Sequence, residues 1–178
     1  MADFPGKVNT QTSLPQLQTG PVHVMNTSVD FNFIKSMPGI LLLVEIAFGL
    51  LVWALISSAA YWVVPAYGWV LFVSITLWIL TVVLFIMLIL GMRQKLSSIP
   101  WPLALLVFYA VASILYFTAF LANTVSITVF GGGYHFNHMA VSAFFAIFVT
   151  VAYSANAAFA YMEWKGDGGN AAMSTVPV

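Results

Sequence analysis

Glu45 is the residue whose chemical type fits its surroundings least. It lies in the middle of the apolar run ILLLVEIAFGLLVWALI, residues 40–56. A charged carboxylate in the centre of a membrane costs at least about 2.5–3.5 kcal/mol, so a carboxyl group there should be protonated or partnered. An acid in such a run is therefore a candidate functional residue by default.

Two polar residues in other apolar runs are expected near Glu45. Counted from the predicted inner boundary of its helix, Glu45 lies about seven residues deep, or about 10 Å at the rise of an α-helix. Asn156 and Tyr109 fall at nearly the same depth in their own runs. We predict a hydrogen-bonded cluster of Glu45, Asn156 and Tyr109 that fixes the register of the helices. The alternative is a proton or cation site, but a single acid without a second carboxylate or a base makes a poor relay.

Small residues recur at four-residue spacing in the last apolar run. Small side chains on one helix face let two backbones approach closely in lipid. We expect this face to pack inside a bundle, and an interface between copies of the chain is the alternative. The face consists of Ser142, Ala146, Thr150, Ser154 and Ala158.

His135 and His138 are three residues apart and follow Gly131-Gly132-Gly133. The spacing would suit a metal site or a pH sensor if the segment were helical. No third ligand accompanies them, so ordinary surface histidines are expected. The sequence contains no Cys, no phosphate-binding loop and no metalloprotease or hydrolase motif. We therefore expect no bound metal, no cofactor, no catalytic residue and no enzymatic activity.

The composition indicates the kind of structure that holds these residues in place. Of the 178 residues, 62% are hydrophobic and only 6% are charged, whereas a soluble domain carries about a quarter charged residues. Four apolar stretches are each long enough to cross about 30 Å of hydrocarbon as a helix. Their short connections predict an all-α, four-helix transmembrane bundle of up-down-up-down topology. The four helices are expected at residues 38–58, 69–92, 102–123 and 139–164, within a four-pass domain at 34–164.

The segments outside the spans are assigned by composition. The polar ends, residues 1–33 and 165–178, read as disordered tails. The second outer loop, residues 124–138, could form a short hairpin with VSITVF and YHFNH as strands.

Orientation follows from the basic residues. Lys7, Lys35, Arg93, Lys95 and Lys165 all fall on one predicted side of the membrane. Because cytoplasmic loops carry the excess of Lys and Arg, both termini are expected in the cytoplasm. The net charge is zero, which gives no reason to expect a nucleic-acid partner.

Four further segments, in order and spacing, resemble the MARVEL-domain proteins of the MAL proteolipid group. They are GLLVWALI at 49–56, PAYGWV at 65–70, PWPL at 100–103 and AVSAFFA at 140–146. The resemblance covers nearly the whole chain. It implies a four-helix membrane organiser that associates with cholesterol- and sphingolipid-rich domains and sorts cargo in apical and endosomal traffic. It further implies apical or myelin plasma membrane and endosomal or Golgi membranes as locations.

The resemblance implies membrane lipids as partners, and the tails are expected to contact cytoplasmic trafficking adaptors or SNAREs. It assigns no catalytic role to any residue. Self-association into homo-oligomers is also expected.

The alternative function is an oligomeric ion channel or transporter. Most spans are apolar all round, no ring of charge is evident, and no span is broken by proline. These features are untypical of conduction pathways and of transporter sites.

Overall fold

In the computed structural model, the described residues form a bundle of four long helices and two short ones. The structure describes residues 31–58, 64–96, 99–130 and 136–174. The long helices are α2 (Met37–Ser58), α3 (Pro65–Ile89), α5 (Trp101–Phe130) and α6 (Phe136–Ser174). All four are long and apolar enough to cross a membrane, and the described ranges hold no strand. The predicted all-α, four-span fold is confirmed.

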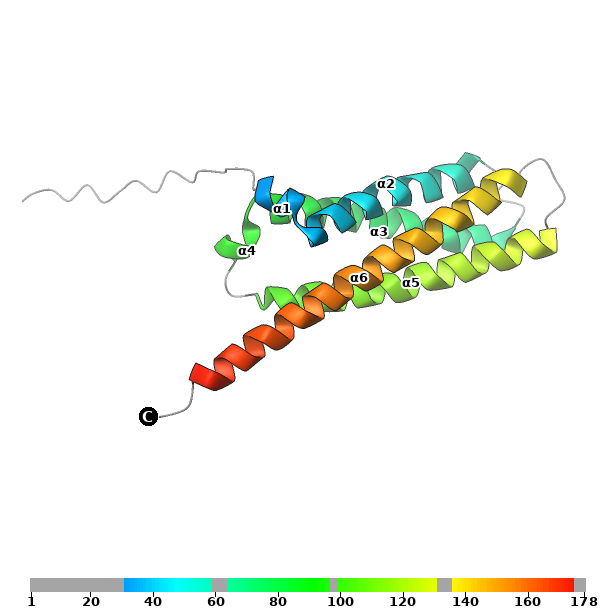
Figure 1. Ribbon diagram of the computed structural model, residues 1–178. Helices are drawn as coiled ribbons and strands as arrows, with labels where there is room; N and C mark the ends of the chain where they lie inside the picture. The colour runs from blue at the N-terminus through cyan, green and yellow to red at the C-terminus, as the bar shows by residue number, and fades with distance from the viewer. Residues whose placement is uncertain (1–30, 59–63, 97–98, 131–135, 175–178) are drawn as a thin grey trace, which may run out of the picture.

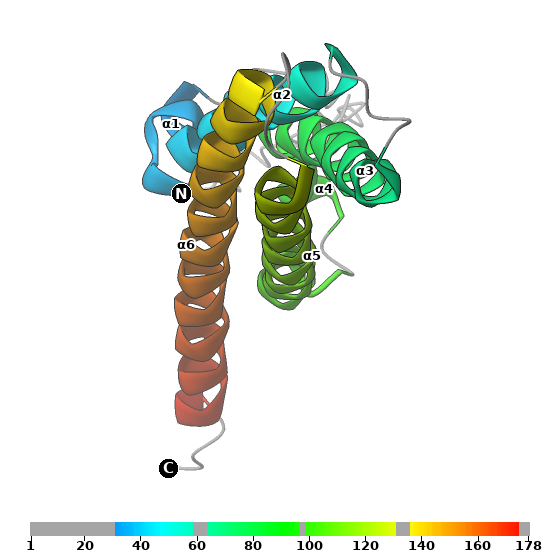
Figure 2. The same ribbon diagram turned by 90° about the vertical axis from the view of Figure 1, so that its right-hand side faces the viewer.

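The long helices are arranged as a ring in which each contacts two others. α6 packs against α5 and α2, and α3 packs against α2 and α5. Successive long helices run in opposite directions, so the described chain begins and ends at the same end of the bundle (Figure 1). After a turn of 90°, α5 lies between α6 and α3 (Figure 2). That the shared end faces the cytoplasm stays a prediction from the basic residues.

A short helix, α1 (Phe31–Lys35), turns sharply into α2 at Ser36. The hydroxyl of Ser36 accepts a hydrogen bond from the backbone N–H of Gly39, 3.3 Å away, and so caps α2. A Cβ atom on Gly39 would lie 2.1 Å from the carbonyl oxygen of Phe33. Only glycine therefore lets α1 pack this closely on the start of α2.

At the same end of the bundle, α3 passes into the short helix α4 (Met92–Lys95) through Gly91. Gly91 has φ of 65°, and its N–H donates to the carbonyl of Leu88. A left-handed glycine after the last helical residue is the usual way to close a helix. This turn sets the position of Arg93 on α4.

Large apolar side chains cover the outside of the bundle and small or hydroxylated ones fill much of its interior. Ile114 is 65% exposed and Phe72 is 61% exposed, whereas Tyr116 and Tyr153 are buried. Such a distribution suits lipid as the solvent, because small interior residues bring helices together where lipid supplies no hydrophobic drive. The buried small residues include Ala112, Ala119, Ala146 and Ala152.

Several helix boundaries differ from those expected. α3 begins at Pro65 rather than residue 69, and α5 continues to Phe130 rather than 123. Residues 125–130 are thus helical, and the strand proposed for VSITVF is wrong. In a membrane every backbone group needs a partner, which a continued helix supplies and an isolated hairpin edge does not. The second proposed strand extends into residues outside the described ranges.

The end of α6 also differs from the expectation. The helix runs to Ser174, whereas residues 165–178 were expected to be disordered. Extending an existing helix needs no new nucleus, so a helix can continue past the last apolar residue. Most of the predicted N-terminal tail lies outside the described residues.

Candidate functional site

Glu45 on α2 and Asn156 on α6 are in direct contact. Each residue is 1% exposed, and the side-chain amide nitrogen Nδ2 of Asn156 donates to Glu45 Oε1 across 2.8 Å. This bond links the first long helix to the last. Glu45 Oε2 and Asn156 Oδ1 are buried without a hydrogen-bond partner among the described residues.

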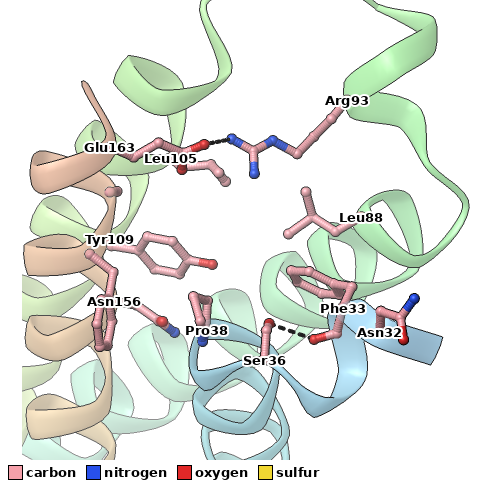
Figure 3. Close-up of a pocket in the computed structure, with 12 residues that line it drawn as sticks. Asn32, Phe33, Ser36, Pro38, Leu88, Arg93, Leu105, Tyr109, Asn156 and Glu163 are labelled. Atoms are coloured by element: carbon pink, nitrogen blue, oxygen red, sulfur yellow. Dashed lines mark hydrogen bonds and ion pairs between the residues drawn. The ribbon is translucent and has the colours of Figure 1, made fainter. Parts of the chain in front are cut away.

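Tyr109, the third predicted member, lies near this pair but makes no hydrogen bond to either residue within the described ranges. It is 3% exposed, and its ring points into a cavity that Asn156 also lines (Figure 3). It lies close enough to Glu45 for an electrostatic interaction. The structure thus places it beside the pair without joining it to them.

Two further tyrosines, which the sequence pattern does not single out, lie near the pair. Tyr116 and Tyr153 lie within electrostatic range of Glu45, and their ring centres are 5.6 Å apart. The Tyr153 hydroxyl lies 2.7 Å from the Thr81 hydroxyl on α3, so a hydrogen bond crosses the bundle from α6 to α3. The available signal was a tyrosine inside an apolar run, where a buried hydroxyl seeks a partner.

A cavity of about 390 Å³ opens at the end of the bundle where the described chain starts and finishes. Its walls include Phe33, Leu88 and Leu105, which come from α1, α3 and α5. Arg93 on α4 and Glu163 on α6 lie at its rim and form an ion pair (Figure 3). The two predicted residues Tyr109 and Asn156 therefore line a cavity with a charged rim and largely apolar walls.

The predicted small-residue face divides into two parts. Ser142, Ala146 and Thr150 are buried, and Ser142 Oγ donates to the backbone carbonyl of Val52 on α2 across 3.2 Å. Ser154 and Ala158 are exposed. Each four-residue step rotates about 40° beyond a full turn of an α-helix, so the stripe winds out of the interface.

Nearer the cavity, other residues form the buried face of α6. Tyr153, Asn156 and Ala160 take over the interior positions. Ser154 Oγ lies 2.7 Å from Ser113 Oγ on α5. The exposed Ser154 side chain therefore still links α6 to α5.

Only one of the two histidines can be placed. His138 lies exposed near the start of α6, whereas His135 is outside the described residues. No group of three His, Cys, Asp or Glu side chains that could hold a metal ion occurs in the parts of the chain that the structure describes. The candidate site is therefore the carboxyl–amide pair with its tyrosines and cavity.

Comparison with known proteins shows which proteins this chain is similar to. Residues 33–159 match the MARVEL family, described as a membrane-associating domain. Plasmolipin of Danio rerio is 56% identical over 178 residues, 100% of each chain. Plasmolipin of Homo sapiens is 44% identical over 176 residues, 98% of this chain and 96% of its own.

A more distant relative covers less of the chain. The CKLF-like MARVEL transmembrane domain-containing protein 8 of Mus musculus is 39% identical over 136 residues, 76% of this chain and 79% of its own. No solved structure matches.

Proposed function

This chain belongs to the MARVEL family of membrane-associating domains, and from that premise we propose that it organises ordered, cholesterol- and sphingolipid-rich membrane domains. In this role it acts in apical and endosomal vesicle traffic and in myelin-type membranes. Its locations are the plasma membrane and endosomal or Golgi membranes. Its partners are membrane lipids, further copies of the chain, and cytoplasmic adaptors or SNAREs.

The observation that carries the proposal is the length of the apolar helices. α3 has 25 residues, or about 37 Å at the rise of an α-helix. The apolar part of α5, Trp101–Val129, has 29 residues, or about 43 Å. The hydrocarbon core of the endoplasmic reticulum is about 27 Å thick and that of sterol-rich plasma membrane about 32–33 Å. The free-energy cost of hydrophobic mismatch is smaller for long spans in the thicker membrane. This difference favours their location in ordered domains.

The outer surface of α5 allows the length argument to be tested directly. Val125 and Val129, near the end of α5, are 59% and 66% exposed. Replacing both with Ser shortens the apolar surface of α5 by about one turn without touching the core. Replacing both with Ala keeps the surface apolar and serves as the matched control.

The test is partitioning of the purified protein in giant vesicles with coexisting ordered and disordered phases. We expect the natural chain and the Ala variant to be enriched in the ordered, thicker phase, and the Ser variant to shift toward the thinner one. Equal partition of all three between the phases would refute the proposal.

One observation favours the second candidate, an oligomeric ion channel or transporter. The buried Glu45–Asn156 pair places a carboxyl group inside a membrane span, where ionisable residues often mark ion pathways. Ion leak from the same vesicles tests this directly. Selective leak that Glu45→Gln abolishes would establish conduction, and tight vesicles at high protein density would exclude it.

A further inference from the structure

The cavity at the end of the bundle where the described chain begins and ends offers a free hydroxyl to its interior. The Tyr109 hydroxyl points into the cavity and is open to it, with no hydrogen-bond partner in the described ranges (Figure 3). Two other polar side chains of the lining are already engaged or turned away. Nδ2 of Asn156 donates to Glu45 and its Oδ1 is buried, and the Ser36 hydroxyl donates to the Phe33 carbonyl.

Arg93 on α4 adds charged donors at the rim of the cavity. A guanidinium group has five N–H donors, and the ion pair with Glu163 is made through Nη2. The other terminal nitrogen of Arg93 points toward the interior (Figure 3). Arg93 also lies within electrostatic range of Tyr109, so one ligand can contact both. Because the planar fork of an arginine matches a phosphate or a carboxylate, the rim suits an anionic head group.

Beyond these donors the wall of the cavity is apolar. Leu88, Leu105 and Phe159 line it from α3, α5 and α6, and Phe33 lines it from α1. Its volume of about 390 Å³ lies near the lower end of the usual range of ligand pockets, about 300–1,000 Å³. A space of this size, enclosed by several helices, suits one alkyl chain rather than the two chains of a bilayer phospholipid.

The order of these groups, from the rim to the interior, matches the order of groups in one class of lipid. A 1-acyl glycerol 3-phosphate carries a phosphate, then an ester carbonyl, then an alkyl chain. We propose that the cavity binds this single-chain amphiphile. The phosphate contacts Arg93, the ester carbonyl accepts a hydrogen bond from the Tyr109 hydroxyl, and the chain lies along the apolar wall. Glu163 competes with the phosphate for Arg93. This site does not depend on the membrane-organising role.

The test uses the full chain in phosphatidylcholine nanodiscs and a lauroyl glycerol 3-phosphate that carries a photoreactive diazirine on its acyl chain. Labelled peptides are mapped by mass spectrometry. Three unlabelled competitors separate the contacts. They are 1-lauroyl glycerol 3-phosphate, its ether analogue without the carbonyl, and 1-monolaurin without the phosphate. All three have the same chain length, so their contacts with the apolar wall are equal.

We expect labelling on the segments of α3, α5 and α6 that line the cavity. The ester phosphate should compete at least about tenfold better than monolaurin, because monolaurin lacks the charge-assisted bonds to Arg93. It should compete about threefold better than the ether, which lacks one neutral hydrogen bond. Equal competition by monolaurin would refute an anionic head group. Equal competition by the ether would refute the contact with Tyr109, and either result overturns the proposal.

Substitutions at the rim test the sign of the charge that the ligand carries. Arg93→Gln should reduce labelling about tenfold, whereas Glu163→Gln should raise it about threefold because the competing carboxylate is removed. Lys95→Gln is the matched control and should change nothing, because Lys95 is a cation on the same short helix but does not line the cavity. Weaker labelling in Glu163→Gln would mean that the ligand is a cation and would refute the proposal.

Two further variants tie the labelling to the interior of the cavity. Tyr109→Phe keeps the buried ring and removes only the hydroxyl, so the ester and ether compounds should then compete equally. Ala160→Leu narrows the cavity from α6 and leaves both donors in place, and it should also reduce labelling. Unchanged labelling in both Arg93→Gln and Ala160→Leu would show that the lipid binds elsewhere and would overturn the proposal.

Discussion

Asn156 and Glu45 are 111 residues apart in the chain, and the amide of one donates to the buried carboxyl of the other across 2.8 Å. The bond joins the helices that begin and end the bundle. The contribution of this bond to stability depends on the free-energy cost of burying each group without its partner. A buried group left without its partner costs about 1–3 kcal/mol, more than the bond itself contributes.

Glu45→Leu should therefore lower the free energy of unfolding by about 1–3 kcal/mol, because Asn156 Nδ2 loses its acceptor. Glu45→Gln retains an acceptor oxygen and should cost much less. Unfolding in detergent, followed by circular dichroism, measures both. The double variant Glu45→Leu with Asn156→Leu should recover part of the loss. Equal destabilisation by Gln and Leu would mean that the carboxyl group acts through its charge or proton.

Thr81→Val and Tyr153→Phe each remove one hydroxyl of the bond that crosses the bundle. The coupling energy from the double-mutant cycle should be about 0.6 kcal/mol and at most about 1.7 kcal/mol, as for other hydrogen bonds between membrane helices. Tyr116→Phe is the control, because the Tyr116 hydroxyl has no partner among the described residues. That variant should be neutral or slightly stabilising. Zero coupling would show that the two hydroxyls do not bond.

Gly39→Ala should destabilise the corner between α1 and α2 by about 1–3 kcal/mol, the usual cost of forcing extra atoms into a packed site. The new Cβ would meet the Phe33 carbonyl at 2.1 Å. Gly68→Ala is the matched control, since Gly68 is a helical position with no atom within 4 Å of an added Cβ. It should stabilise α3 by up to about 1 kcal/mol. Thermal unfolding compares the two, and a neutral Gly39→Ala would contradict the close packing of α1.

Arg93→Gln should change the free energy of unfolding by less than about 1 kcal/mol, although it breaks the Arg93–Glu163 ion pair. The two side chains are 35% and 42% exposed, and exposed ion pairs contribute little. Unfolding at low and high salt tests this, because a screened pair should lose even its small contribution. A loss above about 2 kcal/mol would show that the pair is shielded from solvent.

The fold could be predicted from the sequence because each span is a long, mostly apolar run with proline or polar residues near its ends. The ends of the helices could not. Residues 125–130 are rich in β-branched side chains, which favour strands in water, yet α5 continues through them to Phe130. In lipid the chain must satisfy the hydrogen bonds of its own backbone, and this requirement outweighs the local preference for a strand.

Part of the candidate site could be predicted from the sequence. Glu45 and Asn156 share a depth that the sequence alone gives, and depth was enough to place them together. Depth does not give the direction in which a side chain points, so Tyr109 was expected to join the pair but lines the cavity instead. The role of Tyr153 depends on Thr81 across the bundle, and no spacing in the sequence relates those two residues.

Of the four spans in the described residues, Glu45 lies in the first and its partner Asn156 in the last. A nascent chain therefore carries an unmatched acid in lipid until translation of α6 is complete, at a cost of at least about 2.5–3.5 kcal/mol. Truncated chains keep that exposed acid and finished ones do not. The contact can therefore form only once α6 has joined α2 in the membrane.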